Sequence, residues 1–147
     1  MTVKIRALRA SDRARWEDLF RAYIAFYEAE VADDVIAGTF RALLSGHAGS
    51  HVCFVAVDTQ DKPIGLAHML FHRSTWSRTG YVYLEDLFVD PAARAGGVGE
   101  ALIRRVMAEA DRLGATRTYW TTQESNARAR RLYDKLATRA PFVQYRR

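Results

Sequence analysis

The sequence predicts one mixed α/β domain, with a central mixed β-sheet of about six strands flanked by about four helices. Residues 81–122 follow the order strand, glycine-rich loop, helix, strand, which is typical of a βαβ unit with a parallel strand pair. Residues 51–71 hold two β-type runs separated by a turn, which predict a hairpin. Residues 16–27 repeat apolar residues every three or four positions, the spacing of an amphipathic helix. Because 147 residues can bury one core, we expect residues 1–147 to form a single domain.

The N-terminal third predicts one strand and two helices. Val3 to Leu8 alternates as a strand does, and Ala10-Ser11-Asp12 marks a helix start with Ser11 or Asp12 as the N-cap. The apolar stripe of this first helix, which we expect to lie mostly in the core, consists of Trp16, Leu19, Phe20, Tyr23, Ile24 and Tyr27. A shorter second helix is expected from about Asp34 to Leu44, closed by Ser45-Gly46.

The middle of the chain predicts three strands. His51 to Val57 and Ile64 to Phe71 form the hairpin, with Asp58 to Pro63 as its turn. Tyr81 to Val89 is rich in aromatic and β-branched residues and stops at Asp90-Pro91. His51, His68 and His72 are too dispersed for a zinc site, so we expect partly exposed strand histidines and no metal.

The C-terminal third predicts a helix from Glu100 that ends at Gly114, a fifth strand over Thr116 to Thr122, and a last helix capped by Ser125 or Asn126. The apolar positions of the last helix are Ala129, Leu132, Tyr133 and Leu136. Pro141 to Arg147 has room for one short strand.

Bulk properties narrow the function. The net charge is +5, but the arginines are scattered and no nucleic-acid-binding motif accompanies them, so a nucleic-acid partner is not expected. The acidic residues gather in two places, and these are Glu28, Glu30, Asp33, Asp34, Glu85 and Asp86. Such clusters favour a cationic substrate. No apolar run has the length of a membrane span, no signal-peptide pattern opens the chain, and a single Cys53 suits a reducing compartment, so we expect a cytoplasmic protein.

The loop from Arg94 to Gly99 holds three glycines in four positions directly before a helix. Backbone N–H groups at a helix N-terminus, with the helix dipole, bind phosphate, and glycine lets the ligand approach the backbone. The loop is no P-loop, because no Gly-Lys-Ser/Thr follows, and it is a poor dinucleotide fingerprint, because Leu102 stands where the third glycine is required.

Arg94, Gly97 and Gly99 instead resemble the Arg/Gln-x-x-Gly-x-Gly/Ala signature for acetyl-coenzyme A in the GCN5-related N-acetyltransferase (GNAT) family. The wider spacing matches from Leu87 to Leu102 without a gap. Asn126 to Tyr133, Asn-x-x-Ala-x-x-Leu-Tyr, is similar to the last block of the same family. Two departures are Ala95 in place of the first loop glycine, and residues 137–142 in place of the usual Gly-Phe. Within the family, the chain looks closest to the Hpa2-like and diamine (spermidine/spermine) acetyltransferase branches.

The resemblance implies a GNAT fold that uses acetyl-CoA as co-substrate. It places the pantetheine arm on the strand backbone and the pyrophosphate on the loop amides. The cofactor-binding residues that it implies are Leu87, Phe88, Val89, Arg94, Ala95, Gly96, Gly97, Val98, Gly99, Glu100, Asn126 and Ala129.

By the same resemblance, Tyr133 is the general acid toward the departing thiolate, and the Leu87 N–H stabilises the oxyanion. Glu85 binds the amine and accepts its proton. Because successive strand side chains face opposite sides, only one of Glu85 and Asp86 can face the substrate, and we expect Glu85. The expected substrate-binding residues are Tyr27, Glu28, Glu85 and Asp86.

The predicted activity is acetyl transfer from acetyl-CoA to a primary amine, by direct attack in a ternary complex, with a small polyamine-like cation as the favoured acceptor. A protein lysine or N-terminus is an alternative acceptor, and a non-catalytic acetyl-CoA sensor is an alternative function. Because the tail after Leu136 offers one strand where the family commonly has two, the sheet keeps an open edge, and we expect a homodimer with the C-terminal strand near the interface.

Overall fold

The computed structural model describes residues 3–147 and contains one mixed five-stranded sheet in the order β1-β2-β3-β4-β5. The strands are β1 (Lys4–Ala7), β2 (His51–Val57), β3 (Pro63–His72), β4 (Tyr81–Val89) and β5 (Arg117–Tyr119). Successive strands pair antiparallel from β1 to β4, and β5 pairs parallel with β4. The predicted mixed fold and its parallel pair are therefore confirmed.

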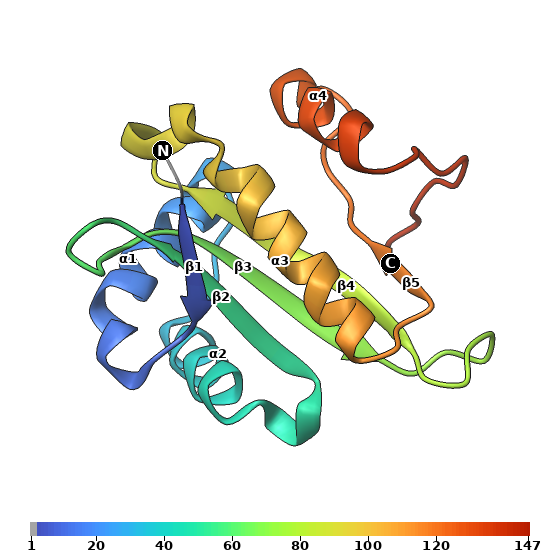
Figure 1. Ribbon diagram of the computed structural model, residues 1–147, viewed down its shortest axis with the longest axis horizontal. Helices are drawn as coiled ribbons and strands as arrows, with labels where there is room; N and C mark the ends of the chain where they lie inside the picture. Colours follow the sequence, from blue (N-terminus) through green and yellow to red (C-terminus); the bar gives the residue numbers. More distant parts are fainter. Residues whose placement is uncertain (1–2) are drawn as a thin grey trace.

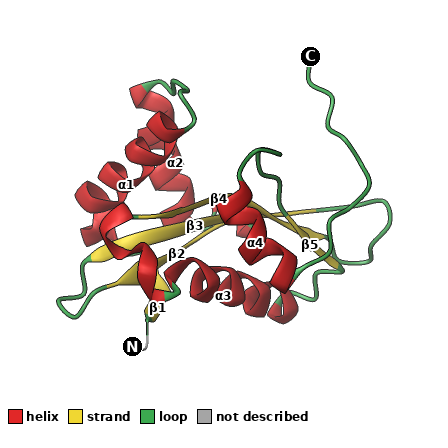
Figure 2. Cartoon of the chain, turned by 90° about the horizontal axis from the view of Figure 1, so that it is seen from above, coloured by secondary structure: helices red, strands yellow, loops and turns green. Residues whose placement is uncertain are grey.

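Helices cover both faces of this sheet. The helices α1 (Arg13–Phe26) and α2 (Asp33–Ser45) lie on one face, and α3 (Val98–Arg112) crosses the other (Figures 1 and 2). The last helix, α4 (Ala127–Leu136), packs Leu132, Tyr133 and Leu136 against the core on the α3 side. Three short 3₁₀ helices, η1 (Ala10–Asp12), η2 (His47–Gly49) and η3 (Pro91–Gly96), fill the connections. None of the helices within residues 3–147 is long and apolar enough to span a bilayer.

The sheet separates two hydrophobic cores. On the α1 and α2 face, Trp16, Phe40 and Leu66 are buried together, as the apolar stripe of the first helix predicts. On the α3 face, the core includes Leu102 and Val106. Cys53 is buried in β2, as its apolar surroundings predict, and burial raises the pKa of its thiol.

The predicted sixth strand is wrong. Residues 137–147 contain no strand, and β5 ends at Tyr119 rather than at Thr122. The tail leaves α4 with Ala137 in an extended conformation, yet no strand in the described part of the chain pairs with it. Its terminal part extends away from the body of the molecule (Figure 2). An extended segment without a ladder partner cannot add a strand to the sheet.

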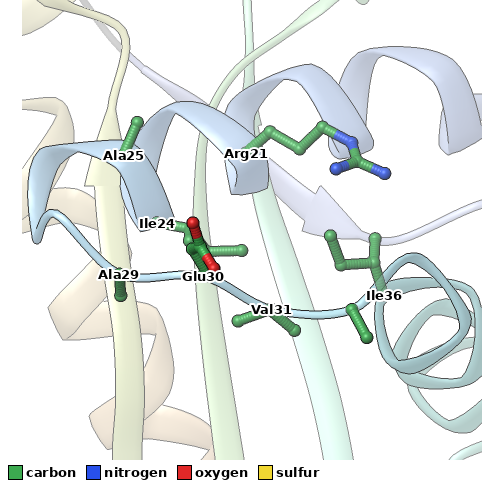
Figure 3. A pocket seen from close by; sticks show the side chains of 8 residues that line it. Arg21, Ile24, Ala25, Ala29, Glu30, Val31 and Ile36 are labelled. Atoms are coloured by element: carbon green, nitrogen blue, oxygen red, sulfur yellow. The ribbon is translucent and has the colours of Figure 1, made fainter.

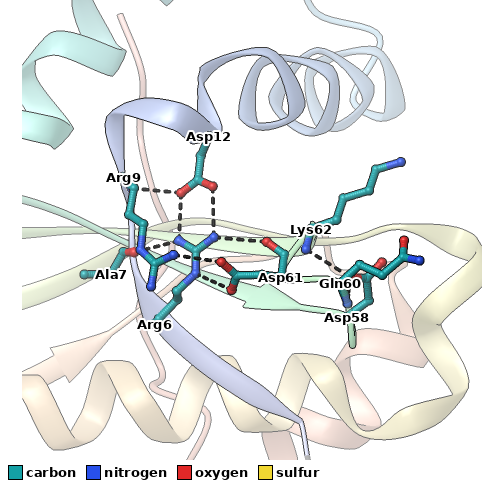
Figure 4. A network of polar contacts seen from close by, with 8 residues as sticks. All are labelled: Arg6, Ala7, Arg9, Asp12, Asp58, Gln60, Asp61 and Lys62. Carbon is teal, nitrogen blue, oxygen red and sulfur yellow. Dashed lines mark hydrogen bonds and ion pairs between the residues drawn. The ribbon is translucent and has the colours of Figure 1, made fainter.

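Asp12 is the N-cap residue of α1, as predicted, but its side chain makes no capping bond to this helix and instead forms an ion pair. The Asp12 carboxylate accepts from Arg6 Nη1 at 2.8 Å and from Arg6 Nη2 at 2.9 Å, and Arg6 Nε donates to Asp61 at 2.9 Å (Figure 4). The Arg9 backbone N–H donates to the same Asp12 carboxylate. This network ties β1 to the β2–β3 turn and to the entry of α1.

We expect Asp12→Asn to lower the free energy of unfolding by about 3 kcal/mol, because Arg6, 9% exposed, loses its buried partner charge. Burial would raise the pKa of Asp12, but the hydrogen bonds from Arg6 and Arg9 outweigh burial and lower it. A lowered folded-state pKa stabilises the protein at neutral pH, and this contribution disappears as the pH falls through that pKa. Urea unfolding of the wild type and of Asp12→Asn at several pH values tests this. The difference between their free energies of unfolding must shrink in acid, and a constant difference contradicts the ionic account.

Candidate active site

A β-bulge in the middle of β4 shapes the candidate site. Ala67 pairs with Leu87 and His68 with Asp86, but the next residue of β3, Met69, pairs with Leu84. Glu85 is therefore the extra residue of β4. A bulge resets the alternation of side chains along a strand. Leu84 and Leu87 consequently both belong to the α3-side core.

The register shift changes the prediction about the two carboxylates. Asp86 points to the α1 face, where it contacts His68. Glu85 follows Leu84, whose side chain lies in the α3-side core, so the Glu85 side chain points to the opposite face, which is the α1 face that Asp86 also occupies. The assumption that only one of the two can face the substrate does not hold here, because the bulge places both on the α1 side.

The edge of β4 that faces β5 is open next to this bulge. Within the described chain, β5 pairs with β4 over Tyr81 to Tyr83 alone, so the segment from Leu84 to Val89 has no strand partner on that side. Backbone N–H and C=O groups on an unpaired edge are free to bind an extended ligand. The predicted oxyanion donor, the Leu87 N–H, belongs to this segment, together with Phe88 and Val89.

The glycine-rich loop ends this open edge. Gly97 has φ +72°, the left-handed conformation that glycine favours, and it precedes α3. The first backbone bond at this end runs from the Ala101 N–H to the Gly97 oxygen at 3.1 Å, so the N–H groups of Val98, Gly99 and Glu100 have no partner inside the helix. A Cβ added at Gly97 would meet no atom within 4 Å, so the space beside this glycine is open. The loop thus has the free backbone donors that the predicted phosphate site requires.

Arg94 and Ala95, also predicted for cofactor binding, lie in η3. The Arg94 Nε–H donates to the Val89 oxygen at 3.0 Å, and its guanidinium lies 5.5 Å from the centre of the Phe88 ring. Arg94 therefore braces the turn between β4 and the glycine loop. Gly96 is exposed at the end of η3.

Tyr133 comes from α4 and lies half-buried, with its ring 5.5 Å from that of Trp120 in a T-shaped arrangement. Burial, with a smaller contribution from Tyr27, raises the pKa of Tyr133 to about 12. Its hydroxyl is therefore protonated at physiological pH and can act as a proton donor.

Asn126 caps α4, one of the two residues predicted to do so. Its side-chain oxygen accepts from the Ala129 N–H at 3.3 Å, and its amide group donates to Thr122 at 3.4 Å. Asn126 and Ala129, both predicted to contact the cofactor, thus form the N-terminus of α4.

The acidic residues after α1 are only partly free. Glu28 is exposed and has φ +53°, while Asp33 is paired with Arg21 at 2.9 Å. Glu30 and Arg21 line a hollow of about 590 Å³ between the end of α1 and the start of α2, together with apolar residues such as Ile24 and Ile36 (Figure 3). Within residues 3–147, Glu28, Glu30, Asp34 and Glu85 carry carboxylates that form no ion pair, and Asp86 contacts the His68 ring.

A second cleft, of about 760 Å³, lies between β5, α4 and the C-terminal tail, and Tyr133 is part of its wall. Arg117, Trp120 and Phe142 line other parts of it. The helix α4, which carries Tyr133, thus borders a large cleft on the β5 side.

Sequence reasoning missed the surroundings of Asp86. His68 was expected to be partly exposed, which is wrong: it is 3% exposed and bonded to both Trp16 and Asp86. The one available signal was a histidine flanked by Ala67 and Met69 in an otherwise apolar strand. Its partners lie 52 and 18 residues away in the chain, which no local pattern reveals. Within residues 3–147, no group of three or more potential metal-ligating side chains is brought together.

Comparisons with known proteins agree on one family. The sequence model of the Acetyltransferase (GNAT) family matches residues 12–137. The D-amino-acid N-acetyltransferase HPA3 of Saccharomyces cerevisiae is 34% identical over 146 residues, which cover 99% of this chain and 90% of the relative.

Solved structures share the fold. The crystal structure of a probable acetyltransferase superimposes with a TM-score of 0.84 and 20% identity, over 97% of this chain and 95% of that one. The aminoglycoside N-acetyltransferase AAC(6')-Iy in complex with CoA has a TM-score of 0.83 and 21% identity, over 99% and 94% of the two chains.

Proposed function

Because this chain belongs to the acetyltransferase (GNAT) family, we propose that it transfers the acetyl group of acetyl-CoA to a small primary amine that carries positive charge. The observation that carries the choice of acceptor is the β4 bulge, which places Glu85 and Asp86 on one face beside the open strand edge. Two adjacent carboxylates attract an ammonium group and disfavour an anionic acceptor.

The chain's own residues would divide the work as follows. When bound, acetyl-CoA supplies the thioester carbonyl that the amine attacks directly in a ternary complex. The free N–H groups in the first turn of α3 and the open edge of β4 would hold this co-substrate. The Leu87 N–H would stabilise negative charge on the carbonyl oxygen. Tyr133 would donate its proton to the leaving thiolate.

Glu85 is the proposed base. A lysine-like amine has a pKa near 10.4, so removing its proton at pH 7 costs about 5 kcal/mol. Partial desolvation, followed by the charge of Asp86, raises the pKa of Glu85. A carboxylate with a raised pKa accepts a proton more readily at neutral pH, while Asp86 would keep a second negative charge on the acceptor.

A free D-amino acid is the second candidate acceptor, favoured by the 34% identity to HPA3 over nearly the whole chain. Such an acceptor carries a carboxylate besides its ammonium group. The positive charge of Arg146 in the C-terminal tail opposes the rise in the pKa of Glu85, so a cation acts on the proposed ammonium site. This arrangement is compatible with a zwitterion.

A panel of amines with detection of the released thiol tests the proposed function. The panel contains spermidine, several D- and L-amino acids, an aminoglycoside, a lysine peptide and an uncharged arylamine. Transfer to the cationic small molecules supports the proposal, and preference for D-amino acids selects the second candidate. Preference for the lysine peptide would favour a protein acceptor. Tight acetyl-CoA binding in calorimetry without transfer to any amine would favour a sensor.

The cofactor site gives a separate prediction. A Cβ added at Gly99 would lie 3.7 Å from Leu132, an ordinary contact, so Gly99→Ala should fold normally, while its methyl group should hinder the approach of a phosphate to the free N–H groups in the first turn of α3. We expect its affinity for acetyl-CoA to fall about tenfold, the equivalent of one weakened charged hydrogen bond.

The control is Gly38→Ala in α2, where the added Cβ would lie 3.7 Å from the Arg41 side chain, and it should bind acetyl-CoA like the wild type. Calorimetry and melting curves on both variants provide the comparison. Undiminished binding by Gly99→Ala rejects this loop as the phosphate site.

We also propose a homodimer in which the C-terminal tail contacts the second copy. Phe142, Val143 and Tyr145 are 86%, 78% and 93% exposed, an unusual apolar exposure for adjacent residues. Light scattering at micromolar concentration should give a dimer for the full chain, and a monomer after removal of residues 141–147. A monomeric full chain contradicts this assembly.

A further inference from the structure

A buried chain of hydrogen bonds leads from α1 to Asp86. The Trp16 Nε1–H lies 2.9 Å from His68 Nε2, and His68 Nδ1 lies 2.8 Å from Asp86 Oδ2. Trp16 is fully buried, His68 is 3% exposed, and Asp86 is 16% exposed. The chain therefore begins in the core and ends at the candidate acceptor site.

The first bond fixes the tautomer of the histidine. An indole N–H can only donate, so Nε2 of His68 must accept and carries no proton. The proton of the neutral ring then sits on Nδ1, from which it is donated to the Asp86 carboxylate. If Nε2 were also protonated, its N–H would point at the N–H of Trp16 in the core, and the two donors would repel each other. This geometry disfavours the positively charged form of His68.

Packing fixes the orientation of the same ring. The Phe20 ring lies 5.0 Å from the imidazole in an edge-on arrangement, and the Trp16 ring lies 5.8 Å away. The imidazole therefore has little freedom to turn away from Asp86.

We propose that His68 is a positioning residue: locked in its neutral form by Trp16, it orients the Asp86 carboxylate so that Asp86 holds the ammonium group of the acceptor. The proposal rests on the proposed acetyl transfer to a cationic amine. Neutrality is essential to it, because a protonated His68 would pair with Asp86 and compete with the substrate for its charge. One carboxylate oxygen, Oδ2, accepts from His68 in the structure. The other, Oδ1, is assigned to the ammonium group.

Other titratable groups surround this chain and must be separated from it. Glu85 adjoins Asp86 on β4, and on α1 burial, followed by the charge of Asp86, raises the pKa of Tyr23. His51 and Cys53 lie on β2, and His51 is electrostatically coupled to His68. Tyr27 at the end of α1 contributes to the raised pKa of Tyr23, and the charge of Arg146 in the tail opposes the rise in the pKa of Glu85. A spectroscopic signal that belongs to His68 itself is therefore required.

The experiment follows the ring nitrogens of His68 by ¹⁵N NMR between pH 5.5 and 8.5, in the wild type and in Trp16→Phe. The wild type should show one neutral tautomer with the proton on Nδ1 throughout, and Trp16→Phe should allow His68 to titrate. In Trp16→Phe, the KM for spermidine should therefore rise as the pH falls through this new titration, with no such step in the wild type.

Two substitutions of His68 separate positioning from packing. His68→Leu removes the donor to Asp86 and should raise the KM for spermidine about tenfold. His68→Asn keeps an N–H near the Nδ1 position and should recover part of this loss. Acetyl-CoA affinity should stay unchanged in both. His72→Asn, on the exposed end of the same strand, is the matched control and should behave like the wild type.

Several outcomes would overturn the proposal: titration of His68 in the wild type, equal losses in His68→Leu and His68→Asn, or equal effects on spermidine and on an uncharged arylamine. If the wild type transfers acetyl to no amine, the proposed function fails on its own. Calorimetric binding of spermidine to the wild type, His68→Asn and Asp86→Asn then decides whether this carboxylate holds an amine. If Trp16→Phe does not fold, the wild-type tautomer and the two His68 variants still decide whether His68 positions Asp86.

Discussion

Replacing Tyr133 with phenylalanine is expected to lower the maximal rate of acetyl transfer by about 10²-fold, the usual strength of general acid catalysis. The substitution removes only the hydroxyl group. The ring keeps its T-shaped contact with Trp120, so folding and acetyl-CoA affinity should be nearly unchanged. The departing thiolate then leaves without a proton from the protein.

A general-acid role for Tyr133 implies a definite pH dependence of this loss. Because burial and Tyr27 raise the pKa of Tyr133 to about 12, the hydroxyl stays protonated through neutral and mildly alkaline pH. The ratio of the wild-type rate to the Tyr133→Phe rate should therefore remain constant from pH 6 to 10.

Tyr81→Phe is the matched control, because Tyr81 is also half-buried but lies on β4 four residues before Glu85. Its rate should equal that of the wild type. Wild-type turnover in Tyr133→Phe, with chemistry shown to be rate-limiting by the absence of a viscosity effect, would make Tyr133 a packing residue of α4.

Local signals predicted much of the fold. The bounds of β2 and β4 agree with prediction because turn-forming or helix-ending residues delimit each strand, such as Asp58 after β2 and Asp90-Pro91 after β4. Gly46 ends α2 in the left-handed conformation that glycine favours, as expected. The glycine loop and the N-cap at Asn126 were likewise readable from residue type and order.

The features that local patterns did not reveal depend on distant partners. The bulge at Glu85 exists only in the pairing of β4 with β3, so period-two reasoning on β4 alone placed Glu85 and Asp86 on opposite faces. Asp12 has the residue type of an N-cap, but its carboxylate forms an ion pair with Arg6, which lies on β1. His68 is buried because Trp16 supplies a donor from another layer.

The second large effect that we expect is a loss of rate when Glu85 in the candidate acceptor site is replaced. We expect Glu85→Gln to lower kcat/KM for spermidine at pH 7 by about 10²-fold, because the base is lost while a neutral side chain of similar size remains. Asp86 stays in place, so part of the attraction for the cation should survive.

The sign of the pH effect follows from the protonation states. The wild-type rate should fall in acid as Glu85 becomes protonated, at a pH above the usual range for glutamate, because partial desolvation and then Asp86 raise its pKa. The Glu85→Gln rate should lack this step and rise toward alkaline pH, where more of the amine is already free. The two profiles should therefore converge as the pH approaches the pKa of the amine.

Glu109→Gln, on α3 at the opposite face of the sheet, provides the matched control and should keep the wild-type profile. The acceptor panel sharpens the same test, because an uncharged arylamine needs no proton removed before attack and should lose far less rate than spermidine in Glu85→Gln. Equal losses for the two amines, or pH profiles of wild type and Glu85→Gln that coincide, would show that Glu85 is a solvated surface charge rather than the base.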